Sequence, residues 1–203
     1  MDWSIFHALN GWLRGEDGAQ DATVVFNSYA IFVLVAVAAA TWLFARPGGS
    51  LRSKLAAASA GFAALLGLAV NAVFGQIWFH DRPFADHPQQ TVLLVRHAAD
   101  NSFPSDHATV AFAVAFAVLF FHRRLGLALL AGACLVGLAR IFVGVHYPAD
   151  ILGSALIGLG SAMIVTTFGR PFVEWLVRQV SRVSDPLVAT ALRALGREEY
   201  VAK

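Results

Sequence analysis

The chemistry-bearing residues of this sequence gather in two polar clusters, residues 102–107 and residues 139–150. An apolar run long enough to cross a bilayer and return separates the two clusters. Ionisable side chains at the edges of such segments carry a desolvation cost, so they are by default candidates for a functional site. We therefore predict a catalytic site at a membrane surface. The candidates in the two clusters are Ser105, Asp106, His107, Arg140, His146 and Asp150.

Phosphate is the ligand that these residue types favour. Pro104 and Pro148 stand where two predicted helices open, a position at which the missing N–H of proline is tolerated. The free backbone N–H groups and positive dipole ends of both helices would then face one surface, and such helix ends bind anions. Arg82 and Arg140 add guanidinium groups whose fork geometry suits phosphate oxygens. The pattern predicts a phosphate site built from two helix N-termini and two arginines.

Two histidines beside a phosphate can divide the work of phosphoryl transfer. Asp150 follows His146 by four residues, so its carboxylate could accept the proton of one ring nitrogen and leave the other free to attack phosphorus. His107 would then protonate the leaving oxygen as a general acid. Charge on the transferring phosphoryl group would be stabilised by backbone N–H groups and by Arg82, Arg140 and Ser105.

The composition places this site in a membrane protein. Of the 203 residues, 58% are hydrophobic and 14% are charged, and the mean hydropathy is +0.64. This apolar share exceeds that of ordinary soluble domains. The basic residues form no stripe interleaved with aromatic residues, so nucleic acid is not an expected partner. The single cysteine, Cys134, lies in an apolar run, so no internal disulfide can form.

Apolar runs of roughly the length that crosses a bilayer recur along the chain. They cover residues 23–44, 55–79, 105–121, 125–143 and 148–168. Between the second and the third run, residues 80–104 show no sustained periodicity, and a loop of this length is usually functional or mobile. We therefore predict an all-α integral membrane protein, a bundle of about five transmembrane helices.

Amphipathic segments flank this bundle at both ends. Residues 1–22 place aromatic and leucine side chains on one helical face and are too short and polar to span, which predicts an interfacial helix. Residues 170–203 are amphipathic and basic, which predicts a tail that lies on a membrane face. No repeat or second domain is visible, so residues 1–203 are expected to form a single membrane-embedded domain.

The alternation of the spans brings the loop 80–104, Arg140 and His146 to one side of the bilayer. The other side receives 11 of the 15 basic residues, namely Arg46, Arg52, Lys54, Arg123, Arg124, Arg170, Arg178, Arg182, Arg193, Arg197 and Lys203. Cytoplasmic loops carry the excess of lysine and arginine. We therefore predict a multi-pass protein of the cell membrane, with a cytoplasmic tail and a site that faces away from the cytoplasm.

These residues resemble the signature of a known family. Arg82-Pro83, Pro104-Ser105-Asp106-His107, and Arg140 followed at the family spacing by His146 and Asp150 are similar to the three motifs of the type 2 phosphatidic acid phosphatase superfamily. Those motifs read Lys-x6-Arg-Pro, Pro-Ser-Gly-His and Ser-Arg-x5-His-x3-Asp, and here they cover residues 74–150. The length, the Asp in the second motif and the short N-terminal helix look most like the undecaprenyl-diphosphatase branch of the bacitracin-resistance type.

The resemblance implies a role for each matching residue. His146 would be the nucleophile, His107 the general acid and Asp150 the relay, and the phosphate would be bound by Arg82, Ser105 and Arg140. The substrate would be a polyprenyl diphosphate, hydrolysed through a phosphohistidine to the monophosphate and inorganic phosphate, which recycles a cell-wall lipid carrier. No metal or other cofactor is implied. The oligomeric state and the prenyl length do not follow from the sequence.

Two positions depart from the family pattern. Gly75 stands where the family has its lysine, so that phosphate contact is missing or is supplied by Gln76, His80 or a loop group such as Arg96. Ala139 replaces the serine of the third motif. Asp106 stands where the general motif has glycine and is a further candidate for the site.

Other readings of the same residues stay open. Arg82 and Arg140 could be interfacial anchors, and Ser105 could be a simple helix cap. We expect His80, His87, His97, Asp81 and Asp86 to be solvated loop residues unless His80 replaces the lysine. The alternative substrate is a glycerophospholipid monoester, either phosphatidic acid or phosphatidylglycerol phosphate. The alternative class of function is a non-catalytic membrane protein that binds an anion.

Overall fold

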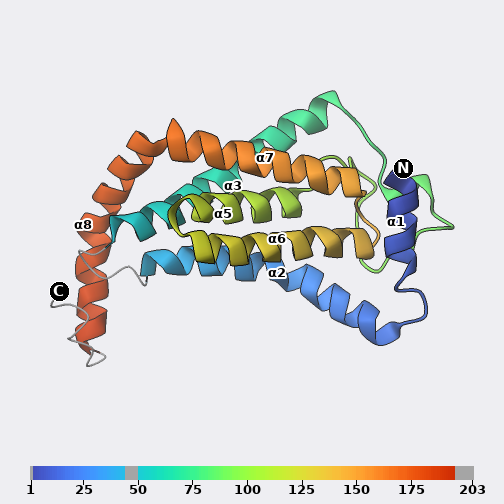
Figure 1. The fold of residues 1–203 in the computed structure, drawn as a ribbon, viewed down its shortest axis with the longest axis horizontal. Coiled ribbons are helices and arrows are strands. Elements are labelled where there is room, and N and C mark those ends of the chain that lie inside the picture. The colour runs from blue at the N-terminus through green and yellow to red at the C-terminus, as the bar shows by residue number, and fades with distance from the viewer. Residues whose placement is uncertain (1, 44–49, 195–203) are drawn as a thin grey trace.

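The computed structural model describes residues 2–43 and 50–194, and this part of the chain is helical without any strand. Figure 1 shows the helices in chain order. Their bounds are α1 (Asp2–Gly11), α2 (Asp17–Leu43), α3 (Leu51–Ile77), α4 (Pro83–Asp86), α5 (Asp106–Phe121), α6 (Arg123–Phe142), α7 (Pro148–Thr167) and α8 (Arg170–Ala194). The predicted all-α membrane bundle is confirmed.

Four of these helices, α2, α3, α6 and α7, are long and apolar enough to cross a membrane. The fifth predicted span is the shorter α5, which is apolar and runs for 16 residues. It packs against α2, α3, α6 and α7, and its N-cap residue Ser105 is completely buried. Because protein surrounds α5, its ends meet other helices and need not reach the membrane surface. The first span begins at Asp17, earlier than the predicted residue 23.

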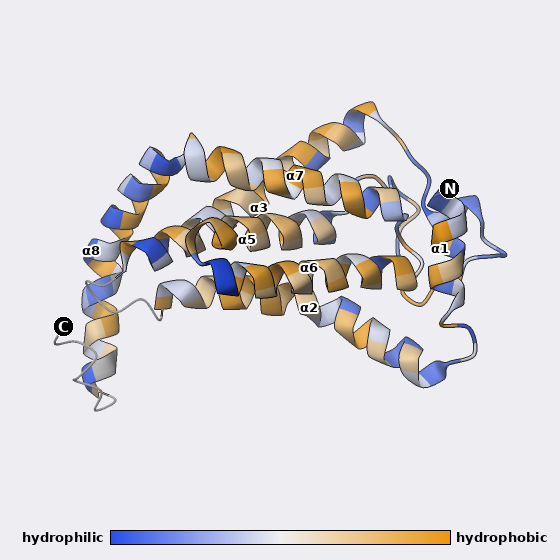
Figure 2. Ribbon diagram, in the orientation of Figure 1, coloured by the Kyte–Doolittle hydropathy of each residue, from blue (hydrophilic) through white to orange (hydrophobic). Residues whose placement is uncertain are grey.

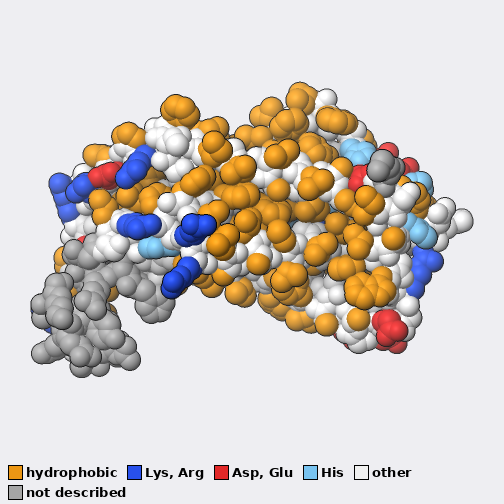
Figure 3. All heavy atoms as spheres, in the orientation of Figure 1, with side chains coloured by type: hydrophobic (Ala, Val, Ile, Leu, Met, Phe, Trp, Pro, Cys, Tyr) orange, Lys and Arg blue, Asp and Glu red, His pale blue; other side chains and the backbone are white. Residues whose placement is uncertain are grey.

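Small residues let the helices pack closely around α5. Five alanines of α5 are fully buried. A Cβ placed at Gly67 of α3 would lie 2.7 Å from Cγ2 of Thr109, and one at Gly158 of α7 would lie 2.7 Å from the backbone nitrogen of Ala113. Such close approach is how membrane helices gain packing energy without a hydrophobic driving force. Large apolar side chains instead cover the outer surface in Figure 3, where lipid would surround them, and the ribbon in Figure 2 shows hydrophobic residues along most of the long helices of the bundle.

Helix α1 lies across the end of the bundle where α6 ends and α7 begins (Figure 1). Its Phe6 is fully buried, with ring centroid 5.5 Å from that of Tyr147. Asn10 donates hydrogen bonds to the carbonyls of Val92 (2.8 Å) and Phe142 (3.0 Å), and it accepts one from the Val92 N–H (2.7 Å). The predicted interfacial helix therefore ends at Gly11 and is tied to the protein itself.

Helix α8 lies across the opposite end of the bundle (Figure 1). It carries arginines together with exposed Phe172 and Trp175, as expected for an amphipathic helix at a membrane face. Buried Lys54 of α3 anchors it through Ser181 (3.1 Å) and Asp185. The last part of the predicted tail, with Arg197 and Lys203, and the Arg46 connection lie outside the described residues.

Candidate active site

His146 lies between a carboxylate and a guanidinium in the turn that joins α6 to α7. Its Nδ1 is 3.4 Å from Oδ2 of Asp150, and its Nε2 is 3.1 Å from Nη1 of Arg82. Arginine can only donate, so Nε2 is the unprotonated nitrogen and Nδ1 carries the proton toward Asp150. This tautomer leaves a lone pair on Nε2, as a nucleophile requires.

Asp150 is held in place by more than His146. Its Oδ2 accepts hydrogen bonds from the hydroxyl of Ser102 (2.6 Å) and the backbone N–H of Tyr147 (2.8 Å). The carboxylate is completely buried in the first turn of α7. A buried carboxylate fixed by two further donors can orient an imidazole and stabilise positive charge that forms on it.

Burial also sets the protonation state of His146. The side chain is almost fully buried, and the charges of Arg140 and Arg82 face it. Desolvation lowers the pKa of His146 well below its ordinary value, and the two arginines lower it further, against the opposing effect of Asp150. The imidazole is therefore neutral at physiological pH.

Arg82 is surrounded by acceptors. Besides His146, its Nη1 donates to the carbonyl of Val145 (2.9 Å), Nη2 to the carbonyl of Asn101 (3.0 Å), and Nε to Oδ1 of Asp100 (2.7 Å). Burial opposes ionisation of Asp100, but the hydrogen bond and charge of Arg82 lower the pKa of this carboxyl overall. Asp100 is thus an anion that already occupies one donor of Arg82, and its side chain is 61% exposed to solvent.

Besides Oδ1 of Asp150, two donor groups at this end are buried without a hydrogen-bond partner in the described part of the chain. They are Nε of Arg140 and the hydroxyl of Ser105. Arg140 is otherwise held by α2, because its Nη1 donates to Oδ1 of Asn27 (3.1 Å). Buried polar groups are normally hydrogen-bonded, so unsatisfied ones need an explanation. A ligand that offers acceptor oxygens, such as phosphate, would satisfy both.

The start of α5 is tied to the start of α7. The backbone N–H of Ser105 donates to the hydroxyl of Ser154 (2.9 Å), whose single proton faces two acceptors, the carbonyls of Asp150 (2.7 Å) and Ser105 (3.1 Å). This bridge fixes the first turn of α5, where His107 is half-buried, relative to the turn that bears His146. The motif of Arg82, the motif of Ser105 and His107, and the motif of His146 and Asp150 therefore meet at one end of the bundle.

One of the two expected anion-binding helix ends is closed by the protein. The side chain of Asp150 takes the N–H of Tyr147, and Oδ1 of Asp2 takes the N–H of Ala149 (3.1 Å). With Pro148 lacking an N–H, the first turn of α7 offers little to an anion. The prediction of two such ends was therefore wrong for α7, because α1 brings an acidic residue that the sequence pattern did not reveal. The α5 end has no such cap, since Ser105 makes no side-chain cap hydrogen bond.

The three additional candidates differ in position. His80 lies against Asp150, with Nδ1 3.6 Å from Oδ1, and its ring stacks on Tyr147 at a centroid distance of 5.1 Å. Asp106 is exposed and accepts a hydrogen bond from Asn71 of α3 (2.8 Å). Gln76 is exposed on the last turn of α3. Of the three, His80 is the one that contacts the His146–Asp150 pair.

The loop 80–104 folds over this end of the bundle, so the expectation of solvated side chains was wrong for the partly buried His80, His87 and His97, whereas Asp86 is exposed as expected. Asp86 accepts a hydrogen bond from the hydroxyl of Tyr147 (3.0 Å). The ring of His87 packs on Trp3 of α1, with centroids 3.7 Å apart, and the ring of His97 lies 6.4 Å from that of His146. Burial, Arg82 and Arg140 together lower the pKa of His97. Asp81 is exposed, as expected.

Sequence reasoning missed three residues that hold the site together, namely Ser102, Asn27 and Ser154. Each had a signal. Ser102 stands just before the Pro104 motif, and Ser154 follows Asp150 by one helical turn. Asn27 is an amide inside an otherwise apolar run, and such a residue in a membrane span is expected to face protein.

A bundle of membrane-spanning helices with a histidine, an aspartate and arginines at one end defines a class of membrane phosphoryl-transfer proteins. The model of the PAP2 superfamily matches residues 56–173, and the chain belongs to this superfamily. It is 38% identical over 191 residues to undecaprenyl-diphosphatase BcrC of Bacillus subtilis (strain 168), a match that spans 92% of this chain and 95% of that protein.

Two solved structures share the fold. The crystal structure of Aquifex aeolicus LpxE aligns with a TM-score of 0.66 and 23% identity, over 80% of this chain and 93% of that one. The transmembrane PAP2 type phosphatidylglycerolphosphate phosphatase from Bacillus subtilis aligns with a TM-score of 0.56 and 20% identity, over 83% and 86%. The protein is a multi-pass membrane protein with the fold of these transmembrane phosphatases.

Proposed function

We propose that this protein is a membrane phosphatase that hydrolyses undecaprenyl diphosphate, or a closely related polyprenyl diphosphate, to the monophosphate and inorganic phosphate. The proposal rests on one observation: a neutral, buried His146 held between Asp150 and Arg82, in a chain that matches an undecaprenyl-diphosphatase over nearly its whole length. The site supplies the chemistry, and the similarity to the relative suggests the substrate.

The reaction would proceed in two displacements. Nε2 of His146 attacks the terminal phosphorus, a P–N bond forms, and the P–O bond to the lipid monophosphate breaks. His107 donates a proton to the departing oxygen. Water then attacks the phosphohistidine with His107 as general base, the P–N bond breaks, and inorganic phosphate leaves. Asp150 stabilises the charge on the imidazole through Nδ1 in both steps.

Binding of the phosphate would rearrange the contacts of Arg82. The phosphoryl group enters between Nε2 of His146 and the guanidinium, and it replaces the Nη1–Nε2 contact and the Asp100 carboxylate. Nε of Arg140, the hydroxyl of Ser105 and the first-turn amides of α5 supply the remaining donors. Donors already fixed in a buried site stabilise the developing charge without reorganisation.

A panel of lipid phosphates tests the proposal. Purified protein in detergent should release phosphate fastest from undecaprenyl diphosphate, more slowly from phosphatidic acid and phosphatidylglycerol phosphate, and equally well with a metal chelator present. The His146→Ala variant serves as the blank. Faster release from either glycerophospholipid would instead identify a glycerophospholipid monoester as the substrate. No release from any lipid by folded protein would support a non-catalytic, anion-binding role.

We further propose that the site faces the outside of the cell membrane. Eight described basic residues lie at or near the α8 end, opposite the His146 end, and Figure 3 shows basic side chains gathered there. They are Arg52, Lys54, Arg123, Arg124, Arg170, Arg178, Arg182 and Arg193. An excess of basic residues marks the cytoplasmic side.

Cysteine labelling in intact cells is expected to report this orientation. In a Cys134→Ala background, Gln89→Cys should react with a membrane-impermeant maleimide, because Gln89 is exposed in the loop that covers the site. Arg124→Cys, exposed at the other end, should react only after the cells are opened. The reverse pattern would place the site in the cytoplasm.

A further inference from the structure

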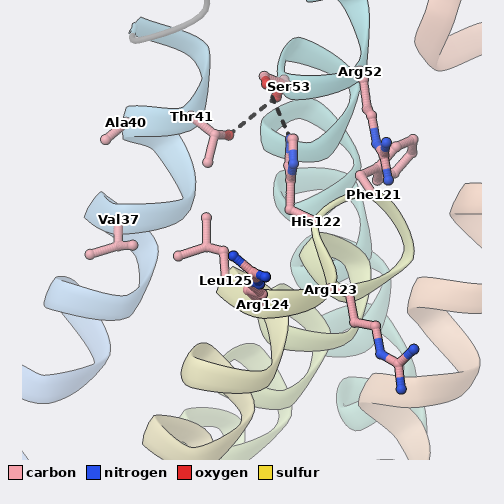
Figure 4. Close-up of a pocket in the computed structure, with 10 residues that line it drawn as sticks. All are labelled: Val37, Ala40, Thr41, Arg52, Ser53, Phe121, His122, Arg123, Arg124 and Leu125. Atoms are coloured by element: carbon pink, nitrogen blue, oxygen red, sulfur yellow. Dashed lines mark hydrogen bonds between the residues drawn. The ribbon is translucent and has the colours of Figure 1, made fainter.

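A hollow of about 750 Å³ lies at the end of the bundle opposite His146. Figure 4 shows that its walls come from α2, the start of α3, and the turn from α5 into α6. Three arginines, Arg52, Arg123 and Arg124, line it, and all three are exposed. Among the described residues that line it, none is acidic. The hollow is therefore a concentration of positive charge on a surface that the proposed reaction does not use.

The acidic side chains in the described part of α8 are already engaged. Glu174 of α8 is paired with Arg178 at 2.6 Å, and Asp185 is paired with Lys54. Within the described residues, none of the three arginines of the hollow forms an ion pair or a side-chain hydrogen bond. Three like charges without a counter-charge repel one another, and an anion bound among them would relieve that repulsion.

Neutral polar groups complete the inner wall. Nε2 of His122 lies 3.1 Å from the hydroxyl of Ser53, and Thr41 of α2 donates to the carbonyl of Ser53 (3.1 Å), as the dashed lines in Figure 4 show. Burial and then the charge of Arg52 lower the pKa of His122. The hollow thus combines hydroxyl and imidazole groups with guanidinium groups, all of which can bind phosphate oxygens.

The remaining wall is apolar and continues onto the surface that faces lipid. Val37 of α2 and Leu125 of α6 line the hollow, and Val33 lies one helical turn before Val37 on the same face of α2. Val33 is more than half exposed, as a lipid-facing residue of a span would be. An occupant that fits both walls has an anionic head and an apolar tail, which excludes a free inorganic anion as the best match.

We propose that this hollow binds one anionic phospholipid from the leaflet on the α8 side. Its headgroup phosphate lies among Arg52, Arg123 and Arg124, and an acyl chain follows Val37 and Leu125 between α2 and α6. Basic pockets between transmembrane helices on the cytoplasmic side recognise such headgroups. The bound lipid would join α2 to the α5–α6 turn at the end of the protein remote from catalysis.

Native mass spectrometry of the delipidated full-length protein tests this proposal. Phosphatidylglycerol should bind as one high-affinity lipid, and phosphatidylcholine with the same chains should bind much more weakly. The double variant Arg52→Gln/Arg124→Gln should lose phosphatidylglycerol affinity about 25-fold, because each arginine beside an anionic headgroup contributes roughly fivefold. Arg52→Lys/Arg124→Lys, which keeps the charge, should retain most of the binding. Unchanged turnover of a soluble aryl phosphate would establish that each variant is folded.

The matched control removes two charges from the same end but outside the hollow. Arg182→Gln/Arg193→Gln on α8 should leave the affinity for phosphatidylglycerol unchanged. Equal losses in the two double variants would overturn the proposal, because the lipid would then respond to general surface charge. Inorganic phosphate that binds the hollow as tightly as phosphatidylglycerol would also overturn it, because the apolar wall would then contribute nothing.

Discussion

Replacement of His146 by alanine is expected to abolish phosphate release from every substrate, by at least roughly 10⁴-fold, because the motif offers no second nucleophile. The neutral imidazole between Asp150 and Arg82 presents the unprotonated Nε2 to Arg82, beside the proposed phosphate position. Phosphate release from undecaprenyl diphosphate, phosphatidic acid and an aryl phosphate measures the effect. All three rates should fall alike.

A covalent intermediate separates a nucleophile from a binding residue. Wild-type protein quenched at alkaline pH during turnover of substrate with a ³²P-labelled terminal phosphate should carry label, and His146→Ala should carry none. Asp150→Asn keeps the size of the side chain but loses its charge, so it should form the phosphohistidine slowly and still be labelled. Substantial turnover by folded His146→Ala would remove the proposed nucleophile and with it the two-step reaction.

The fold could be predicted from the sequence because apolar length is a strong signal. Long runs of Val, Leu, Ala and Phe specify helices that cross a bilayer, and the alternation of spans then puts the three motifs at one end. The short α5 fits the same logic, since an apolar helix surrounded by α2, α3, α6 and α7 has no lipid to span. The length of the apolar runs does not predict where a short helix such as α1 packs against the bundle.

The histidine–aspartate pair of the site could be predicted because its members are close in sequence. His146 and Asp150 lie one helical turn apart, so local geometry brings their side chains together. Ser102, Asn27 and Asp2 reach the site only through tertiary packing. The Asp2 contact with Ala149 joins the start of α1 to the start of α7, far apart in the sequence, and no periodicity predicts it. The sequence predicted an anion site at the N-terminus of α7. The contact with Asp2 occupies the Ala149 N–H that such an anion would need.

The contacts of the loop 80–104 could not be predicted from its composition either. Its polar composition favours solvent, yet Asp100 pairs with Arg82 and His97 lies over His146. The buried guanidinium of Arg82 needs acceptors, and Asp100 supplies one although its own side chain stays 61% exposed. In the proposed reaction, the substrate phosphate would replace the Asp100 carboxylate at Arg82, an exchange of one anion for another.

His107 should behave differently from His146 when it is replaced by alanine. General-acid catalysis contributes about 10²–10⁴-fold where the leaving group needs a proton badly. An alkoxide that leaves phosphatidic acid has that need. The phosphate that leaves a prenyl diphosphate has a second pKa of about 6, so it departs with much less help. The loss for His107→Ala should therefore be largest on phosphatidic acid, smaller on undecaprenyl diphosphate, and smallest on an aryl phosphate with a good leaving group.

The comparison is best made as the ratio of mutant to wild-type kcat/KM across the three substrates, with circular dichroism and thermal unfolding to establish that His107→Ala is folded. His146→Ala provides the matched control, because removal of a nucleophile depresses all three ratios equally. A graded series for His107→Ala assigns the proton transfer to that residue. A flat series would mean that His107 contacts the phosphate from the first turn of α5 without donating a proton, and that another group at this end of the bundle protonates the leaving oxygen.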